Sequence, residues 1–520
     1  MNITDLVTKN ARSNPYNIAF VEVRPVSKIR KEISWAFFNE RTNRIANALI
    51  AQKITKGQKV ALLGRNSINW LEAFFGIMKT GAWVIPLNFR FTKEDIRYCA
   101  AIGEPSFFIF DKEYTEMING TKPELPTVKH FICIGSPSSA DAEGFESLIS
   151  ESSTEPAEVE ISDEDECALY FTSGTTGPPK AVLHAHRGLM VAAITEATNQ
   201  RWTHRDSLLM MPPLYHLAIG HLLGGLIVGG KSVLLTERIK PQYVFETVSN
   251  EQISMVFLLV PWALDILEAL NKGEIRIKDY DLSCWHLMHM GAQPVPPSLV
   301  KRWKDYFPNM AYNNTYGLSE SGGPGVVYLG MENERKIGAI GKPGLIWDVR
   351  IVDEVGKDIP VGQVGEIIVK GSGVMKGYYK NPEATSKTVR KGWLYTGDLA
   401  KMDEEGFIYI VDRKKDLVIS GGENIYPVEI EAVIQKHSKV RDVAVIGLPD
   451  QRLGEAVAAI IEPVPGEVLT TEEMIAFCEE NLPRYKRPRH IIFGQVPRSA
   501  TGKIQKPKLR DAYAKRNIDT

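Results

Sequence analysis

The stretch TSGTTGPPKAVLH, residues 172–184, directly follows the strand-like run CALYF. Gly174 and Gly177 let backbone N–H groups converge, the hydroxyl side chains add donors, and Lys180 adds a positive charge, as in a phosphate cradle. The stretch is not a Walker A loop, because alanine rather than Ser or Thr follows the lysine. A linker between two domains has the same Ser/Thr/Gly/Pro composition. The stretch alone therefore leaves two interpretations, a phosphate-binding loop and a linker.

Strand and helix patterns alternate around this stretch. KVALLG, SINWLEAFFGIMKTG and AWVIPL indicate strand, helix and strand, and the same order returns at SMVFLLV, PWALDILEALNKG and WHLMHMG. Such alternation predicts parallel sheets with helices packed on their faces, which is an α/β fold. The apolar run at 217–230 is shorter than a membrane-spanning helix and carries His221, so it predicts a buried helix.

The second half of the chain predicts two smaller units. From about residue 338 to residue 413, short strands such as GEIIVKG and GFIYIVD lie between turns, which indicates a β-rich subdomain. Beyond it, VRDVAVIGLPD and EAVAAIIEP predict paired strands, and TTEEMIAFCEENL predicts a helix with Thr471 as N-cap. We expect a large N-terminal domain of two αβ-layered subdomains plus the β-rich one, followed by a small α+β C-terminal domain.

Composition excludes several kinds of partner. The 520 residues include 62 basic and 63 acidic side chains, so no basic field attracts nucleic acid or a membrane surface. Five scattered cysteines argue against a disulfide framework and against zinc, and they fit a reducing compartment. The N-terminal residues lack the apolar region of a signal peptide. We therefore expect a cytoplasmic globular protein without a membrane span or a nucleic-acid partner.

Six motifs occur in a fixed order along the chain. TSGTTGPPKAV is followed by PLYH, NTYGLSE, YTGD, DRKKDLVISGGENIYPVEIE and PRSATGKIQK. Together they resemble the adenylate-forming superfamily, which contains acyl-CoA synthetases, adenylation domains of peptide synthetases and luciferases. The resemblance covers essentially the whole chain and is nearest to medium-chain acyl-CoA and aryl-CoA ligases. It implies an N-terminal domain over 1–413 and a mobile C-terminal domain over 414–520, with a hinge at Lys415.

The resemblance implies a first reaction in which a carboxylate attacks the α-phosphorus of ATP and releases pyrophosphate. Positioning and charge neutralisation dominate such a reaction. Lys503 matches the lysine between carboxylate and α-phosphate, Ser319 is implied to donate to that phosphate, and His216 resembles a gate beside the carboxylate. Glu320 is implied to hold Mg²⁺ together with Thr175.

The same resemblance implies a set of ATP- and AMP-binding residues, in which Tyr316 stacks on adenine and Asp398, assisted by Arg413, binds the ribose hydroxyls. Taken singly, these residues have ordinary interpretations too: Asp398 as a turn aspartate, Glu320 as an exposed loop acid, Lys503 as a solvated lysine. Lys506 and Lys508 are expected to be solvated lysines. The full set is Thr172, Ser173, Gly174, Thr175, Thr176, Gly177, Lys180, Gly291, Ala292, Gln293, Asn314, Thr315, Tyr316, Gly317, Asp398, Ile410 and Arg413.

The second reaction implied by the family is attack of the CoA thiol on the acyl-AMP after rotation of the C-terminal domain. Gly421 and Gly422 have no side chains, so a pantetheine arm could pass them. Arg487 and Arg489 match positions that contact the CoA nucleotide phosphate, and Tyr485 is placed to stack on its adenine. A solvated run of charges explains this last cluster equally well.

The acid is expected to be apolar, either medium-chain, alicyclic or aromatic. Leu217 follows the motif histidine where amino-acid-activating relatives place an aspartate. The glycine-rich pocket walls suggest room for more than acetate. The residues expected to line the acyl pocket are Leu217, Gly220, Pro261, Trp262, Gly291 and Gly322.

The sequence thus predicts an ATP-dependent acid–CoA ligase with ATP, Mg²⁺ and CoA as small-molecule partners. An acyl-adenylating enzyme that loads a phosphopantetheinyl carrier protein shares every motif up to Lys503. A non-catalytic nucleotide-binding protein is the third interpretation, which the complete set of motif residues disfavours. A homodimer is left open.

Overall fold

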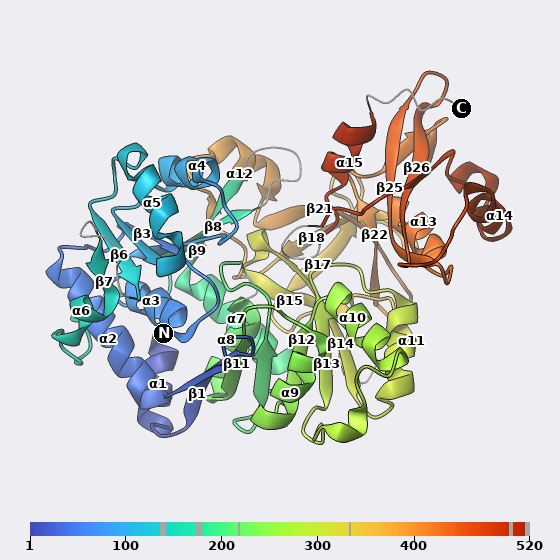
Figure 1. The fold of residues 1–520 in the computed structure, drawn as a ribbon. Helices are drawn as coiled ribbons and strands as arrows, with labels where there is room; N and C mark the ends of the chain where they lie inside the picture. The colour runs from blue at the N-terminus through green and yellow to red at the C-terminus, as the bar shows by residue number, and fades with distance from the viewer. Residues whose placement is uncertain (136–141, 173–178, 217–218, 332–333, 499–502, 515–520) are drawn as a thin grey trace.

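Two large sheets form most of the molecule (Figure 1). The computed structural model describes residues 1–135, 142–172, 179–216, 219–331, 334–498 and 503–514. Within them, sheet 1 has the strand order β16 (Lys342–Pro343), β15 (Gly323–Tyr328), β14 (Ala311–Leu318), β13 (Leu287–Gly291), β12 (Met255–Leu258), β10 (Ser207–Met210), β11 (Lys231–Leu235), β1 (Ile18–Arg24) and β2 (Ile29–Ser34). Sheet 2 has the order β19 (Gly377–Tyr378), β9 (Lys180–Ala185), β8 (Glu166–Thr172), β4 (Trp83–Leu87), β3 (Lys59–Leu63), β5 (Phe107–Asp111), β6 (His130–Ile134) and β7 (Glu143–Gly144).

Both sheets are parallel in their centres and antiparallel at an edge. The pairs β10–β11, β12–β13 and β13–β14 are parallel, as are β3–β4 and β3–β5. Antiparallel pairing occurs at β14–β15 and at β8–β9. Parallel strands need helical crossovers that cover the faces of the sheet, which is why the alternating pattern predicts this fold correctly.

The helices of the N-terminal part form layers around the two sheets. One apolar cluster lies between the sheets and is built by α2, α3, α7 and α8, with Trp35, Trp70 and Phe74 fully buried. A second cluster lies under α9, α10 and α11 on the outer face of sheet 1, and a third under α4 and α5 on sheet 2. The bounds are α1 (Asp5–Ser13), α2 (Trp35–Ala51), α3 (Ile68–Met78), α4 (Lys93–Gly103), α5 (Thr115–Thr121), α6 (Phe145–Ser150), α7 (His186–Asn199), α8 (Ile219–Val228), α9 (Pro241–Glu251), α10 (Val260–Asn271) and α11 (Pro297–Tyr306).

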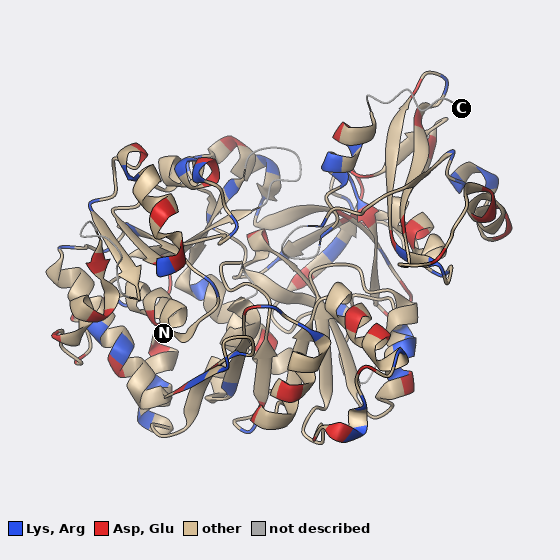
Figure 2. Ribbon diagram, viewed as in Figure 1, with Lys and Arg blue, Asp and Glu red and all other residues tan. Residues whose placement is uncertain are grey.

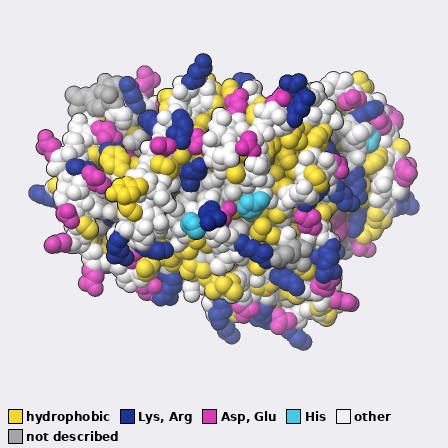
Figure 3. Space-filling view, turned by 90° about the horizontal axis from the view of Figure 1, so that it is seen from below, with side chains coloured by type: hydrophobic (Ala, Val, Ile, Leu, Met, Phe, Trp, Pro, Cys, Tyr) yellow, Lys and Arg dark blue, Asp and Glu magenta, His cyan; other side chains and the backbone are white. Residues whose placement is uncertain are grey.

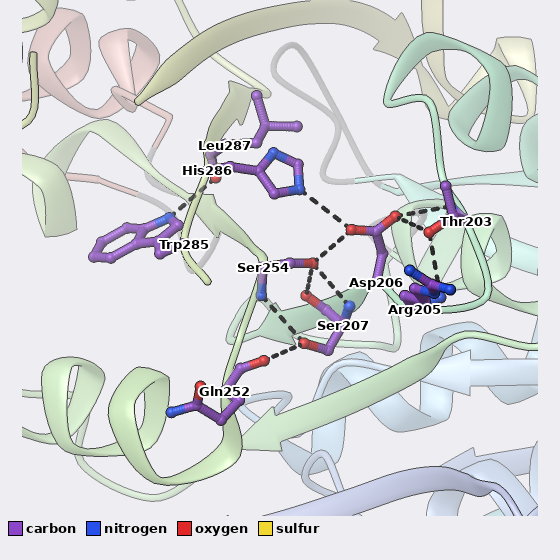
Figure 4. Close-up of polar contacts among 9 residues, drawn as sticks. All are labelled: Thr203, Arg205, Asp206, Ser207, Gln252, Ser254, Trp285, His286 and Leu287. Atoms are coloured by element: carbon purple, nitrogen blue, oxygen red, sulfur yellow. Dashed lines mark hydrogen bonds and ion pairs between the residues drawn. The ribbon is translucent and has the colours of Figure 1, made fainter. Parts of the chain in front are cut away.

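Polar side chains tie together the amino-terminal ends of three strands of sheet 1 (Figure 4). Ser254 Oγ donates to Asp206 Oδ1 at 2.9 Å, and Ser207 Oγ donates to the carbonyl of Gln252 at 2.9 Å. The Asp206 carboxylate also accepts from the backbone N–H and the hydroxyl of Thr203. These bonds satisfy backbone groups where the strands begin, and they lie at the end of the sheet opposite to the motif residues.

A small β-rich sheet, sheet 3, follows sheet 1 in the chain. Its strands are β17 (Asp348–Val352), β18 (Gly365–Lys370), β21 (Trp393–Met402), β20 (Val389–Arg390) and β22 (Ile408–Arg413). All its pairs are antiparallel among the described residues, as the turn-rich sequence predicts. The region is not wholly separate, because β19 returns to pair with β9 of sheet 2 and helix α12 (Pro382–Thr388) follows it.

The C-terminal residues form sheet 4, drawn in orange and red in Figure 1. Its strands are β24 (Glu423–Ile425), β23 (Val418–Ser420), β26 (Gly454–Pro463), β25 (Val440–Asp450) and β27 (His490–Phe493). The predicted pairing of β25 with β26 is confirmed. Helices α13 (Pro427–Ile434) and α14 (Thr471–Asn481) cover one face, and α15 (Lys506–Tyr513) covers the other.

The predicted cap of α14 is wrong by one residue. Thr470, not Thr471, is the N-cap, and its hydroxyl accepts a hydrogen bond from the backbone N–H of Glu473 at 3.2 Å. Both threonines offer the same hydroxyl, so their sequence does not distinguish which one leaves the helical conformation.

The surface carries both signs of charge. Charged residues occur mainly on helices and loops (Figure 2), and basic and acidic groups are interspersed over the face seen in Figure 3. Of the helices in the described part of the chain, none is both long enough and apolar enough to span a membrane. The apolar run that carries His221 is the buried helix α8, as the sequence predicts.

Candidate active site

The phosphate-loop stretch connects two paired strands. Thr172 ends β8, Lys180 begins β9, and the two residues face each other in the antiparallel register. A loop between hydrogen-bonded neighbours of one sheet does not separate two domains, so the linker interpretation is wrong. Ser173, Gly174, Thr175, Thr176 and Gly177 lie outside the described residues.

Asp398 is the centre of a polar cluster at the meeting point of sheets 1 and 3. Tyr316 Oη of β14 donates to Asp398 Oδ2 at 2.7 Å, and Arg413 Nε of β22 donates to Asp398 Oδ1 at 3.0 Å. Asp398 and Arg413 are register partners on β21 and β22, which explains why they lie side by side. The aspartate is only 5% exposed, and a charge so deeply buried requires the partner that Arg413 provides.

Glu320 lies next to this cluster on a single turn of 3₁₀ helix, Ser319–Ser321. Its Oε1 accepts a hydrogen bond of 2.8 Å from the hydroxyl of Tyr378. Lys180 Nζ lies 4.7 Å from the centre of the Tyr378 ring, so the lysine of the phosphate loop and the glutamate of the NTYGLSE motif both contact this one tyrosine. Tyr378 is the contact that sequence reasoning missed, since nothing in KGYYK marks it.

His184 positions the backbone of the same turn. Its Nε2 donates to the carbonyl oxygen of Ser319 at 2.7 Å. Burial lowers the pKa of His184 to about 4, so the ring is neutral at neutral pH. His184 ends the quoted loop stretch, and sequence reasoning assigned it no role.

Lys503 is carried to these groups from the C-terminal part of the chain. The pKa of Lys503 lies below the ordinary value, first because the ammonium is buried and then because Arg413 carries a like charge. The negative charges of Asp398 and Glu320 raise this pKa, but less than the other effects lower it. The pKa of His216 falls to about 4, first through burial and then through the charge of Lys503. The structure therefore brings together the predicted catalytic residues of three motifs, PLYH, NTYGLSE and PRSATGKIQK.

A second contact joins the C-terminal part to Gln293, one of the predicted nucleotide-binding residues. Arg498 is held by Asp442 of β25 through two bonds of 2.7 Å, and its Nη1 donates to Gln293 Oε1 at 3.3 Å. Ala292 has a positive φ of 67°, which turns the chain sharply after Gly291. A Cβ on Gly291 would lie 2.9 Å from the carbonyl oxygen of Thr315, so this position needs glycine.

The remaining predicted nucleotide residues lie beside Tyr316. Asn314 and Thr315 are buried on β14, and Ile410 packs with Tyr316 on the apolar cluster of sheet 3. A Cβ on Gly317 would lie 2.1 Å from the carbonyl oxygen of Gly323, so close strand pairing excludes a side chain there. The binding roles of these residues stay predictions.

The glycines predicted to line the acyl pocket serve packing. Leu217 lies outside the described residues. A Cβ on Gly220 would lie 2.8 Å from Pro324 Cδ, and one on Gly322 would lie 2.6 Å from the carbonyl oxygen of Gly373. Neighbouring atoms thus fill this space, and the argument that the glycines create room for a large acid gains no support. Pro261 and Trp262 are half-buried at the start of α10.

The predicted CoA residues lie on sheet 4 and its loops. Gly421 and Gly422 form the turn between β23 and β24 with φ of 59° and 85°, a conformation that favours glycine. Tyr485 is 50% exposed and the side chain of Arg489 is exposed. Arg487 donates instead to the carbonyls of Leu482 and Glu479, both at 2.9 Å, which caps the end of α14.

Two lysines of the C-terminal part differ from ordinary surface lysines. Lys415 Nζ is buried without a hydrogen-bond partner among the described residues, and burial lowers its pKa to about 8. The expectation that Lys506 is solvated is wrong. Lys506 is 7% exposed, and its Nζ lies 2.8 Å from Glu431. Lys508 is exposed, as predicted.

The polar cluster lies where the large α/β part of the chain meets the small C-terminal part. The model of the family described as AMP-binding enzyme matches residues 7–379, and that of the AMP-binding enzyme C-terminal domain matches residues 429–503. The chain belongs to this family.

Similar proteins place it among CoA ligases. Feruloyl-CoA synthase of Amycolatopsis sp is 33% identical over 92% of this chain and 94% of its own length. The long-chain-fatty-acid–CoA ligase FadD13 of Mycobacterium tuberculosis is 33% identical over 99% of each chain. The crystal structure of the anthranilate CoA ligase AuaEII in complex with anthranoyl-AMP has a TM-score of 0.90 at 26% identity, covering 98% of this chain and 97% of that one. The protein is an AMP-forming acyl-CoA synthetase that uses ATP and CoA.

Proposed function

We propose that the protein activates an apolar medium-chain, alicyclic or aromatic carboxylic acid in two steps at one site. The observation that carries this proposal is the convergence of Lys503 with Glu320, Asp398 and Arg413. A cation delivered from a separate part of the chain to a buried anionic site is suited to a reaction between two anions, a carboxylate and a phosphate.

In the first step, a carboxylate oxygen of the acid forms a bond to the α-phosphorus while the bond to pyrophosphate breaks. Lys503 offsets the charge of the two reacting anions, and Ser319 donates to the α-phosphate. Asp398 orients the ribose, because Arg413 and Tyr316 hold its carboxylate in one position. His216, neutral at its lowered pKa, borders the carboxylate without adding charge.

The site fits a magnesium ion. Glu320 offers a carboxylate whose orientation is fixed by Tyr378, and a hard cation prefers such oxygen ligands. Glu320 and Thr175 would hold the ion, which when bound screens the phosphate charge. Two described residues orient this site: Tyr378 holds the Glu320 carboxylate, and His184 holds the backbone carbonyl of Ser319.

In the second step, the part of the chain from residue 414 onward rotates about Lys415 and withdraws Lys503. Few groups hold Lys415 in place, since its ammonium is buried without a hydrogen-bond partner among the described residues. The turn of Gly421 and Gly422 then borders the path of the pantetheine arm. The thiol sulfur bonds to the acyl carbon, AMP leaves, and the thiol proton goes to solvent.

The names of relatives cover apolar acids and also 4-hydroxybutyrate, so they do not select one acid. Their names include feruloyl, long-chain fatty acyl and indoleacetate as the activated group. A cytoplasmic location is part of the proposal, because all five cysteines are free thiols.

A substrate panel tests the proposal. The enzyme is incubated with ATP, Mg²⁺, CoA and fatty, alicyclic or aromatic acids, and products are identified by mass spectrometry. We expect acyl-CoA and AMP in equal amounts. An acyl-AMP that is transferred to a phosphopantetheinyl carrier protein but never to free CoA would contradict the CoA ligase and select carrier loading.

A further inference from the structure

Three buried residues converge in the layer between sheets 1 and 2. Glu196 comes from α7, His221 from α8 and His289 from the middle of β13, and each is at most 5% exposed. Glu196 Oε2 lies 3.2 Å from His221 Nδ1 and 3.6 Å from His289 Nε2, and the two nitrogens lie 3.0 Å apart. The proposed ligase mechanism uses none of these groups.

Hydrogen bonds alone do not satisfy this arrangement. His221 Nδ1 faces both Glu196 Oε2 and His289 Nε2, but a ring nitrogen carries a single proton and can direct it well at only one of them. Glu196 Oε1 is buried and lacks a hydrogen-bond partner among the described residues. Among the described residues, Glu196 forms ion pairs only with the imidazoles of His221 and His289, which are charged only when protonated. No lysine or arginine of the described chain forms an ion pair with this buried carboxylate.

The three atoms have the spacing of metal ligands. Bonds of about 2.0–2.1 Å to a tetrahedral zinc ion place neighbouring ligand atoms about 3.4 Å apart. The observed separations of 3.2, 3.6 and 3.0 Å fall around this value. All three atoms carry a lone pair, and a two-histidine, one-carboxylate set is a recurrent ligand set for zinc.

Gln200 supplies a fourth vertex. One end of its side-chain amide lies 3.3 Å from Glu196 Oε2 and 3.2 Å from His289 Nε2. The two ends of an amide have the same shape and are assigned by their hydrogen bonds. If the Gln200 amide is reversed, its oxygen lies beside Glu196 and His289. Its nitrogen then lies beside the Asn313 amide, at the position of the present contact of 3.1 Å. Asn313 Oδ1 is buried and has no hydrogen-bond partner among the described residues. If the Asn313 amide is reversed as well, this oxygen accepts a hydrogen bond from the Gln200 nitrogen.

We propose that Glu196, His221 and His289, with Gln200 as a fourth or supporting ligand, bind a zinc-type divalent transition-metal ion. The two imidazoles favour zinc, cobalt or nickel over magnesium, so this site is distinct from the proposed Mg²⁺ site at Glu320. The scattered cysteines argue only against a thiolate site and leave a histidine–carboxylate site open. The ion would fasten α7 and α8 to β13, the strand that ends at Gly291, and contribute to folding stability.

The metal alone tests the proposal, independently of the ligase activity. Tag-free full-length protein is purified from zinc-supplemented medium and analysed by elemental mass spectrometry. A second sample is loaded with Co²⁺ and its visible absorption is recorded. We expect about one metal ion per chain, an intense tetrahedral Co²⁺ spectrum, and a lower Tm after chelation. Protein that takes up well below one equivalent of either metal, with no such spectrum, would overturn the site and leave a hydrogen-bonded Glu–His–His cluster.

Variants locate the site. Glu196→Gln and His289→Gln should lose stoichiometric metal, and Gln200→Ala should weaken affinity about 10- to 100-fold. His286→Gln is the matched control, since His286 lies exposed beside β13 and pairs with Asp206 (Figure 4). Variants that keep a native circular-dichroism spectrum and the wild-type metal content would place the ion elsewhere and refute the proposal. If the variants do not fold, the Co²⁺ spectrum and chelation of the wild-type protein decide.

Discussion

Replacing Lys503 by alanine should separate the two half-reactions. Lys503 feels the charges of Arg413, Asp398 and Glu320, so the group contains two positive and two negative charges. Without Lys503, one negative charge is in excess where two further anions must meet. One missing charge about 4 Å from the reacting atoms costs about 4 kcal/mol at an effective dielectric constant of about 20. Acyl-AMP formation should therefore slow about 10³-fold.

The assay measures each step alone. Acid-dependent exchange of pyrophosphate into ATP reports the first step, and acyl-CoA formed from supplied acyl-AMP reports the second. We expect the second rate to stay within about threefold of wild type, because Lys503 would have moved away. Lys508→Ala is the matched control, as Lys508 is exposed in the same segment. Equal losses in both half-reactions, or no loss in the first, would refute this reasoning.

Three further outcomes are expected. Tyr378→Phe removes the hydrogen bond to Glu320 and should raise the Mg²⁺ concentration for half-maximal exchange about tenfold with little change in Tm; an unchanged Mg²⁺ dependence would contradict the assignment. Asp398→Asn loses the charge that pairs with Arg413 and should raise the KM for ATP at least about tenfold, and an unaltered KM would exclude a ribose contact. Because the pKa of His184 is about 4 folded and about 6.5 unfolded, the unfolded chain binds the extra proton between these values. The lowered pKa of His184 contributes fully to the unfolding free energy above pH 6.5, and this contribution is lost as the pH falls. Between pH 7 and pH 5, wild type should therefore lose about 2 kcal/mol of unfolding free energy that His184→Gln retains, as measured by denaturant unfolding. Identical pH profiles for the two proteins would show that this histidine does not titrate on unfolding.

The alternation of strands and helices was predicted from the sequence. Alternating apolar runs indicate the parallel strands, since buried strands and amphipathic helices have different periods. The motif residues Asp398 and Arg413 were predicted together, and the register of β21 and β22 explains their contact. Local pattern could not distinguish Thr470 from Thr471 at the cap of α14, because both offer the same hydroxyl.

Contacts between distant segments were not predictable. Tyr378 reaches Glu320 across 58 positions, and His184 reaches Ser319 across 135. Lys506 looks like its neighbours in a basic segment, but the fold buries it against Glu431. The glycines of α8 suggest open space in the sequence, whereas the space at Gly220 is filled by Pro324. Such effects depend on which surfaces meet, and that information is not local.

The most direct test of the central claim is to fix the C-terminal part where the structure places it. Arg498 and Gln293, in contact at 3.3 Å, are replaced by cysteines in a Cys284→Ser background, which removes the exposed native thiol. The pair is joined by a bis-maleimide, and both half-reactions are measured before and after cross-linking. We expect the cross-linked enzyme to form acyl-AMP at a rate near that of the uncross-linked variant and to lose acyl-CoA formation. A cross-linked enzyme that forms acyl-CoA at an undiminished rate would contradict a mechanism of two arrangements around one site.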